Sequence, residues 1–291
     1  MTAIRPRRSV LYMPGSNARA LEKARSLPAD ALILDLEDAV APDAKELARK
    51  QVCEAVKARG FGKREIIIRA NALSTAWGEA DIAAAAEARP NAILIPKVSS
   101  PRDLEAVEAK LVSAGAASDI ALWAMVETPL AVLNIGSIAS AGGRLACFVM
   151  GTNDLIKEFR GHHTQDRQNL SASLGLSVAA ARAYGLAIVD GVYNDIQNAD
   201  GFVESCKQGR SFGFDGKTLI HPSQVEPCNN VFAPSAAEVE AARKIIAAFE
   251  LPENKGKGAI SLDGRMVELL HAEIARGTVA LADAIAALET P

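Results

Sequence analysis

Two carboxylates stand shortly after apolar runs near the middle of the chain. Glu127 follows the run 120–126 and precedes Thr128 and Pro129, and Asp154 follows the run 145–150. A buried parallel strand offers polar side chains only where it leaves the core, and ligands of α/β folds collect at that carboxyl edge. The alternative for Glu127 is a simple helix cap, because a carboxylate suits a helix N-terminus. The two acids are therefore candidate ligands of one site.

The pair of acids suits a hard metal ion. If the two apolar runs are adjacent strands, the carboxylates can converge on one point. Two carboxylates with waters favour Mg²⁺, which keeps part of its hydration and takes other ligands from substrate oxygens. Mn²⁺ is a possible substitute, whereas a site with histidine would indicate zinc or iron. His162 and His163 lie in a polar stretch, and we interpret them as loop residues.

A cation and an acidic cluster follow other apolar runs. Arg69 ends the run 65–70 and needs a buried anion, either a structural carboxylate or a substrate anion. The acidic cluster contains Asp35, Glu37 and Asp38. It is either the structural partner of Arg69 or a set of groups that hold metal-bound waters. Each residue alone could be a solvated loop charge, but together they indicate one polar rim.

The elements that must position this rim are eight short apolar runs separated by segments with helical patterning. The runs cover residues 9–13, 31–36, 65–70, 91–96, 120–126, 145–150, 186–192 and 217–220. Alternation of strand and helix predicts parallel pairing through right-handed crossovers, and eight units close into a barrel. An open doubly wound sheet is the rival, but no G-x-G-x-x-G follows the first run. We predict an α/β fold, a (β/α)8 TIM barrel with a C-terminal helical extension.

The extension begins where prolines start to punctuate the chain. We expect residues 1–232 to form the barrel and residues 233–291 to form a helical extension, which is too small to be a domain. It contains an Asp263–Gly264 turn followed by a helix to the end. Its amphipathic pattern indicates packing on a barrel, either its own or that of a neighbouring subunit.

Composition excludes several classes of protein. Among 291 residues, 49% are hydrophobic and the net charge is −3, so no global basic field points to nucleic acid or to a membrane surface. No apolar run approaches the 18 or so residues of a membrane span. The four cysteines are scattered without the close pairs of a zinc or dithiol site. We expect reduced thiols and a cytoplasmic enzyme.

The motifs together resemble a known family over nearly the whole chain and in order. They are RSVLYMPGSN (8–17), LDLEDAVAPDAKELAR (34–49), IRAN (68–71), IPKV (95–98), AMVETPLAV (124–132), GTNDL (151–155) and FGFDGKTLIHPSQV (212–225). They are similar to the citrate lyase β-subunit-like family of acyl-CoA lyases, within the HpcH/HpaI aldolase group, which includes malyl-CoA and citramalyl-CoA lyases. The resemblance implies a (β/α)8 barrel in trimers or hexamers. It also implies Mg²⁺-dependent cleavage of a 3-hydroxyacyl-CoA thioester to acetyl-CoA and a 2-oxo acid.

The resemblance also assigns residues. Glu127 and Asp154 resemble the metal ligands, and Arg69 resembles the active-site arginine. The groups around them would be Asp35, Glu37, Asp38 and Lys97, and the contacts to substrate and CoA would be Arg8, Asn17, Arg19, Lys23, Thr128 and His221.

The tail departs from the family pattern at one position. The family usually has Asp where this chain has Glu268, and that acid is supplied to the neighbouring subunit as the general acid/base. Glu268 keeps the carboxylate but adds a methylene, which changes its reach by roughly 1.5 Å. Two alternatives stay open, namely a metal-dependent aldolase on a free 4-hydroxy-2-oxo acid, and a lyase subunit that requires a carrier protein. The sequence does not specify the 2-oxo acid.

Overall fold

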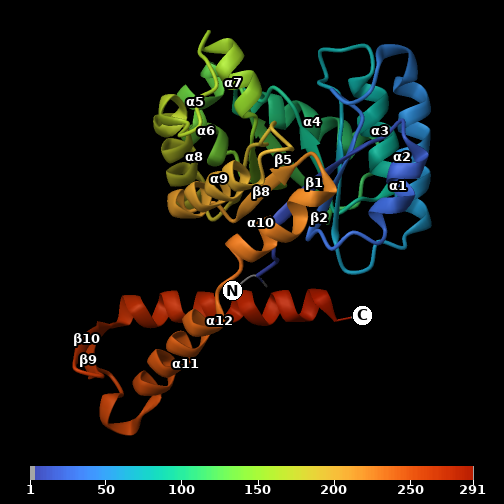
Figure 1. Ribbon diagram of the computed structural model, residues 1–291. Helices are drawn as coiled ribbons and strands as arrows, with labels where there is room; N and C mark the ends of the chain where they lie inside the picture. The colour runs from blue at the N-terminus through green and yellow to red at the C-terminus, as the bar shows by residue number, and fades with distance from the viewer. Residues whose placement is uncertain (1–3, 291) are drawn as a thin grey trace. The chain divides into compact units, whose positions relative to one another are not determined.

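The computed structural model describes residues 4–290 and contains a closed barrel of eight parallel strands in chain order (Figure 1). This confirms the predicted barrel. The strands coincide with the apolar runs to within two residues at most ends. They are β1 (Ser9–Pro14), β2 (Ala31–Asp35), β3 (Glu65–Arg69), β4 (Ala92–Ile95), β5 (Ala121–Val126), β6 (Leu145–Met150), β7 (Ala187–Asp190) and β8 (Gly216–Leu219).

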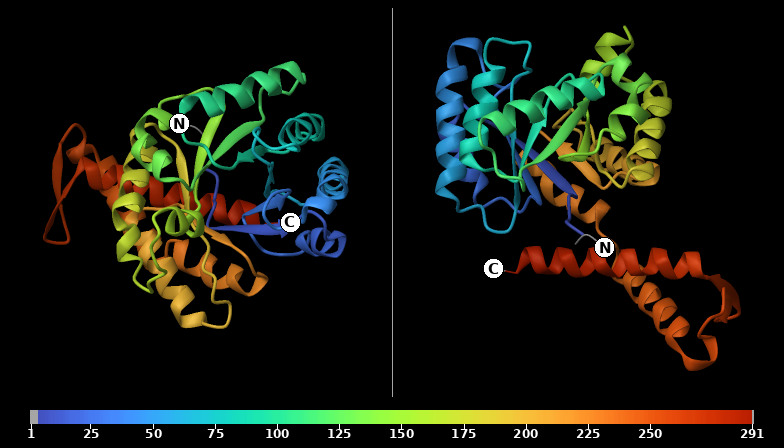
Figure 2. Two further views of the ribbon diagram at one scale, coloured as in Figure 1. Left: turned by 90° about the horizontal axis from the view of Figure 1, so that it is seen from above. Right: turned by 180° about the vertical axis from the view of Figure 1, so that it is seen from behind.

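Helices follow the strands and surround them (Figure 2). They are α1 (Ala18–Ala24), α2 (Lys45–Ala58), α3 (Gly78–Ala88), α4 (Pro101–Ser113), α5 (Pro129–Leu133), α6 (Ile135–Ala139), α7 (Thr152–Glu158), α8 (Ser171–Ala183), α9 (Ala199–Phe212) and α10 (Val225–Phe232). The two short helices α5 and α6 meet at Asn134, whose side chain donates to the Ser99 carbonyl at 2.9 Å. Short 3-10 turns cover Pro42–Ala44, Gln168–Leu170 and Pro222–Gln224.

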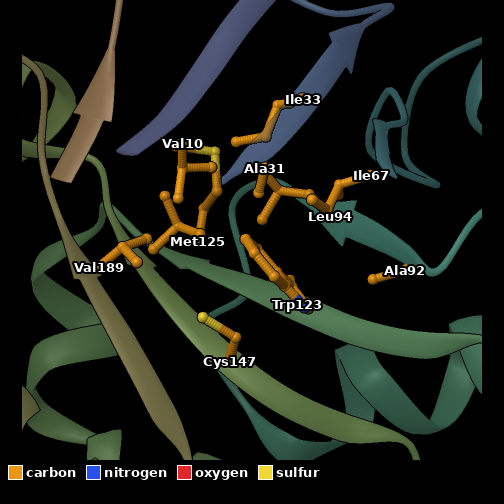
Figure 3. Packing of buried hydrophobic residues seen from close by; sticks show 11 residues of the cluster. Val10, Ala31, Ile33, Ile67, Ala92, Leu94, Trp123, Met125, Cys147 and Val189 are labelled. Atoms are coloured by element: carbon orange, nitrogen blue, oxygen red, sulfur yellow. The ribbon is translucent and has the colours of Figure 1, made fainter. Parts of the chain in front are cut away.

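The barrel interior is filled by side chains from successive strands (Figure 3). Trp123 is fully buried in this cluster, which also contains branched residues such as Val10, Ile33, Leu94 and Val189. These side chains form a packed apolar layer across the barrel, as in other barrels of this type. The functional surface must therefore lie at the strand ends, above this apolar layer.

The rest of the chain forms a second unit. Contacts divide the protein into residues 7–230 and a unit made of residues 4–6 and 231–290, close to the predicted boundary at 232/233. The second unit contains α11 (Ala236–Glu250), the 3-10 turn Pro252–Asn254, the antiparallel pair β9 (Ala259–Leu262) and β10 (Arg265–Glu268), and α12 (Leu269–Glu289). Its own apolar cluster includes Phe249, Ile260 and Ala272.

The hairpin differs from the sequence prediction, which had a turn followed directly by helix. Asp263 and Gly264 both have positive φ, 49° and 76°, which is the geometry of a tight hairpin turn. The four residues on each side therefore pair as strands. No helix of the described part of the chain is both long and apolar enough to cross a membrane.

Candidate active site

A pocket of about 310 Å³ lies at the carboxyl ends of the barrel strands. It gathers polar side chains from β2, β3, β5 and the start of α7 above the apolar layer. Its lining includes Tyr12, Asp35, Asp38, Arg69, Glu127 and Asp154. The structure therefore brings the predicted acids and the predicted arginine to one pocket.

Glu127 is deeply buried in the pocket, with 1% of the residue exposed, as is Asp35. Its Oε1 accepts the backbone N–H of Lys97 at 2.7 Å. The cap of the next helix is Thr128, whose hydroxyl accepts the Ala131 N–H at 3.0 Å. Burial raises the pKa of Glu127 to about 7, opposed by the Lys97 charge and helped by the Asp154 charge. The helix-cap alternative for Glu127 is therefore wrong.

Lys97 lies between the two acids proposed as metal ligands. Its Nζ is 2.7 Å from Oδ2 of Asp154 and 3.5 Å from Oε1 of Glu127. The ion pair with Asp154 and the charge of Glu127 raise the pKa of Lys97, although partial burial acts in the opposite direction. Glu127 and Asp154 thus converge on one cation, as expected for side chains at the ends of neighbouring strands.

Arg69 is held by the acidic cluster. It is 6% exposed, and its Nε and Nη2 donate to the two oxygens of Asp35 at 2.7 and 2.6 Å. Nη1 lies 2.8 Å from Glu37 Oε2 and 3.4 Å from Asp38 Oδ2. Burial alone would lower the pKa of Arg69, but Asp35 holds that pKa well above its usual range. Asp35 is thus an ion-pair partner of Arg69, whose guanidinium lines the pocket, while a role of the cluster toward metal-bound waters stays a prediction.

One acid of the cluster has a raised pKa. Burial raises the pKa of Glu37 to about 8, opposed by the charge of Arg69 and increased by the charge of Asp38. Asp35 also accepts the backbone N–H groups of Glu37 and Ala39 at 2.9 and 3.0 Å, which fixes the loop after β2.

Gly151 is a residue that sequence reasoning did not single out. A Cβ at this position would lie 2.3 Å from Cβ and 2.7 Å from Oε2 of Glu127. Only glycine allows the end of β6 to approach Glu127 this closely, which brings Asp154 within reach of the same site. The Gly-Thr-Asn-Asp motif contained a signal for this, because a glycine directly after a buried strand often marks a close backbone approach.

The donor set of the pocket suits a hard cation. The acids that meet Lys97 offer carboxylate oxygens, which Mg²⁺ prefers, and the pocket leaves room for waters and substrate oxygens. Among residues 4–290 no cluster of three or more His, Cys, Asp or Glu side chains is arranged to hold a metal. A cation held by Glu127 and Asp154 would therefore take its further ligands from groups other than a third His, Cys, Asp or Glu side chain of this part of the chain. His162 and His163 lie in an exposed loop, as expected.

The predicted CoA contacts fall into two groups. Asn17 caps α1 by accepting the Ala20 N–H at 3.1 Å, and Arg19 and Lys23 are exposed on that helix, which follows the carboxyl end of β1. His221 is exposed after β8, where its Nδ1 lies 2.8 Å from the Ser223 hydroxyl. These positions agree with contacts at the carboxyl rim.

Arg8 does not fit the predicted role. It precedes β1, so it lies at the amino end of the barrel, opposite the pocket. Its guanidinium is 4% exposed and donates to both oxygens of Asp30 at 2.9 and 2.8 Å. Arg8 is a buried ion-pair residue of the barrel base, and we leave it out of the site.

Glu268 lies in the second unit, at the end of β10 and at the N-cap of α12. It is exposed, and its backbone N–H donates to Nδ1 of His271 at 3.0 Å in a capping box. A helix-capping role thus accompanies the predicted role as a proton carrier, which stays a prediction.

The family model described as HpcH/HpaI aldolase/citrate lyase matches residues 8–222. A protein of Cereibacter sphaeroides (strain KD131) named (3S)-malyl-CoA thioesterase is 54% identical over 97% of this chain and 96% of its own length. Citrate lyase subunit beta of Escherichia coli (strain K12) is 34% identical over 91% of this chain and 89% of its own length.

Two solved structures superimpose on this chain over nearly its whole length. The protein CitE of Mycobacterium tuberculosis in complex with magnesium, acetoacetate and coenzyme A superimposes with a TM-score of 0.78 at 26% identity. The match covers 97% of this chain and 100% of that one. A citrate lyase of Burkholderia xenovorans LB400 gives a TM-score of 0.82 at 18% identity, covering 99% of this chain and 97% of that one, which is a likeness of fold.

Proposed function

Because the chain belongs to the HpcH/HpaI aldolase/citrate lyase family, we propose that it is a Mg²⁺-dependent enzyme that acts on malyl-CoA. The observation that carries the proposal is the pair Glu127 and Asp154. Both carboxylates lie within ion-pair distance of the Lys97 ammonium in the pocket at the carboxyl end of the barrel. Malyl-CoA suits such a site because its carboxylate and neighbouring hydroxyl are two oxygen ligands on adjacent carbons. The relative with 54% identity is named for the same thioester.

Each residue of the pocket has a proposed role. Glu127 and Asp154 hold the metal, which when bound supplies a Lewis acid that orients and polarises substrate oxygens. Arg69, fixed by Asp35, provides a rigid positive charge close to the oxygen on which negative charge develops. The backbone N–H of Thr128 would donate to the substrate carboxylate, whereas Pro129 at the start of α5 has no N–H to offer.

We propose hydrolysis of the thioester as the reaction. Water adds to the thioester carbonyl, the C–S bond breaks, and the products are malate and free CoA. The 54% identity to a thioesterase over 97% of this chain supports this choice over the C–C cleavage expected from the motifs alone.

Cleavage of the C2–C3 bond is the second candidate. It would convert malyl-CoA into acetyl-CoA and glyoxylate, with Glu268 of a neighbouring subunit delivering the proton to the enolate carbon. Two observations favour it: the 34% identity to a citrate lyase subunit, and the carboxylate that the tail retains at position 268. This candidate includes the predicted trimer or hexamer, because the acid would come from a second copy.

CoA is proposed to bind along α1. Asn17, Arg19 and Lys23 would meet its phosphates, since two cations four residues apart share one face of the helix. His221 would lie near the adenine. Replacing Arg19 and Lys23 together by Ala should raise KM for malyl-CoA and leave kcat nearly unchanged.

The products decide between the candidates. We would incubate the protein with Mg²⁺ and either malyl-CoA or citramalyl-CoA, and identify the products by mass spectrometry. With malyl-CoA, malate with free CoA is the expected result, and acetyl-CoA with glyoxylate would select C–C cleavage. With citramalyl-CoA the corresponding products are citramalate with free CoA, or acetyl-CoA with pyruvate. Asp154→Asn is the control variant and should be inactive with either substrate. Absence of turnover with both thioesters would overturn the proposal.

A further inference from the structure

Lys97 occupies the place where the metal ligands converge. Its ammonium is 2.7 Å from an oxygen of Asp154 and 3.5 Å from an oxygen of Glu127. A Mg²⁺ ion bound by the same two oxygens would lie about 2.1 Å from each of them. Two cations cannot share this space, because their repulsion at such short distance is strong in a partly buried site.

The backbone of Lys97 is anchored independently of its side chain. Lys97 has a positive φ of 56°, which is uncommon for a residue with a side chain. In this conformation its N–H donates to Oε1 of Glu127 at 2.7 Å. Glu127 therefore keeps a hydrogen bond when the ammonium leaves. The side chain of Lys97 is 42% exposed, so it has solvent-accessible space into which to move.

The charges around Arg69 indicate whether Arg69 or Lys97 is the better partner for an anionic substrate. Arg69 is already paired with both oxygens of Asp35 and lies within ion-pair distance of Glu37 and Asp38. Its positive charge is thus largely offset before an anionic substrate enters. Lys97, in contrast, gains an unpaired charge once a divalent cation has neutralised Glu127 and Asp154.

We propose that Lys97 is a displaceable counter-cation that leaves Glu127 and Asp154 when a divalent metal binds, and then pairs with the carboxylate of the acyl group of the substrate. The inference rests on the proposed metal site and assigns Lys97 a positioning role within it. Its flexible four-carbon stem allows the ammonium to move while the backbone stays fixed. Metal would therefore bind before the substrate anion.

Metal affinity without substrate tests the displacement. Calorimetric titration of the metal-free full chain with Mg²⁺ should show Lys97→Met binding at least about tenfold more tightly than wild type, because only molecules whose internal cation has left are competent to bind. Lys97→Arg, which keeps the charge, is the matched control and should not bind more tightly than wild type. Equal or weaker binding by Lys97→Met would overturn the proposal.

The positive φ at position 97 disfavours most residues with a Cβ, so a second neutral variant guards against a folding defect in Lys97→Met. Lys97→Asn is a second neutral variant, since Asn tolerates this backbone conformation better than most residues. A crystal structure of the wild type with Mg²⁺ gives an independent readout. The distance from Lys97 Nζ to Asp154 Oδ2 should exceed the ion-pair limit of about 4 Å. An ammonium that stays within ion-pair distance of Asp154 beside bound Mg²⁺ would overturn the proposal.

Malate binding tests the second part of the proposal, which is that Lys97 pairs with the carboxylate of the substrate. In the presence of saturating Mg²⁺, Lys97→Met should bind malate about tenfold more weakly than wild type, by loss of a charged hydrogen bond. Unchanged malate affinity would refute the pairing with the substrate carboxylate. These measurements use no turnover. A protein inactive on malyl-CoA with tighter metal binding in Lys97→Met would therefore contradict the proposed function and support the displacement.

Discussion

Neutralising Glu127 should stabilise the metal-free barrel, and more so at alkaline pH. The carboxyl is 1% exposed, and burial raises its pKa from 4.5 to about 7. The native state therefore holds this proton more tightly than the unfolded chain does. The resulting stability is fully present below about pH 4.5 and is lost as the pH rises through about 7.

The size of the effect follows from the pKa. A rise from 4.5 to about 7 corresponds to about 3 kcal/mol for a carboxylate ionised in the native state. Between pH 5 and pH 8.5 the wild type should lose about 2 to 3 kcal/mol through this group. Glu127→Gln has no such ionisation, and its amide oxygen can still accept the Lys97 N–H. The stability of the variant relative to wild type should therefore increase by that amount over this range.

Urea unfolding in the presence of a chelator measures this difference. Both tryptophans lie in the barrel unit, and the buried Trp123 makes fluorescence a reporter of that unit. Glu105→Gln, an exposed position on α4, is the matched control and should track wild type at every pH. A difference between Glu127→Gln and wild type that stays flat with pH, or that becomes more unfavourable at pH 8.5, would refute the reasoning.

Four further predictions concern the site and its support. Mg²⁺ should raise the thermal midpoint of wild type more at pH 8 than at pH 6, since it binds ionised Glu127; an equal rise would count against this acid as a ligand. Gly151→Ala should push Glu127 aside and weaken Mg²⁺ binding in calorimetry by about tenfold or more, with circular dichroism unchanged. Asp190→Asn should lower the free energy of unfolding by about 3 to 5 kcal/mol, because it leaves the fully buried Lys217 ammonium without its ion-pair carboxylate. Glu268→Gln should keep CoA binding and lose turnover, and full turnover would remove this acid from the mechanism.

Two controls separate these effects from general disturbance. Gly136→Ala adds a Cβ in α6 where no atom lies within 4 Å, so Mg²⁺ binding should match wild type. Glu240→Gln breaks an exposed ion pair with Lys244 and should leave stability nearly unchanged. A loss of metal binding in Gly136→Ala, or a loss of stability in Glu240→Gln equal to that of Asp190→Asn, would show that the predicted effects are not specific.

The barrel could be predicted because its strands are continuous apolar runs. Strands covered on both faces lose the alternation of polarity, and the sheet register then places their last residues on one rim. This rule alone located Glu127, Asp154 and Arg69 at one pocket. The hairpin around Asp263 and Gly264 was missed, although Asp-Gly between two short segments is a strong hairpin signal.

The partners of the charged residues could not be predicted in the same way. The sequence placed Lys97 after a strand, but its contact with both acids depends on a positive φ that no local pattern announces. Arg8 was assigned from its motif, whereas its place before β1 puts it at the amino end of the barrel with Asp30. For Arg8, the direction of β1 is therefore a better guide to its location than the motif in which it occurs.

The most direct test of the proposed function is metal-dependent turnover of malyl-CoA. Wild-type protein would be treated with a chelator, freed of it, and assayed with and without added Mg²⁺ by following loss of malyl-CoA. We predict no turnover without metal, recovery on addition of Mg²⁺, and no recovery in Asp154→Asn. Full turnover in the chelated protein, or recovery in the variant equal to wild type, would contradict the central claim.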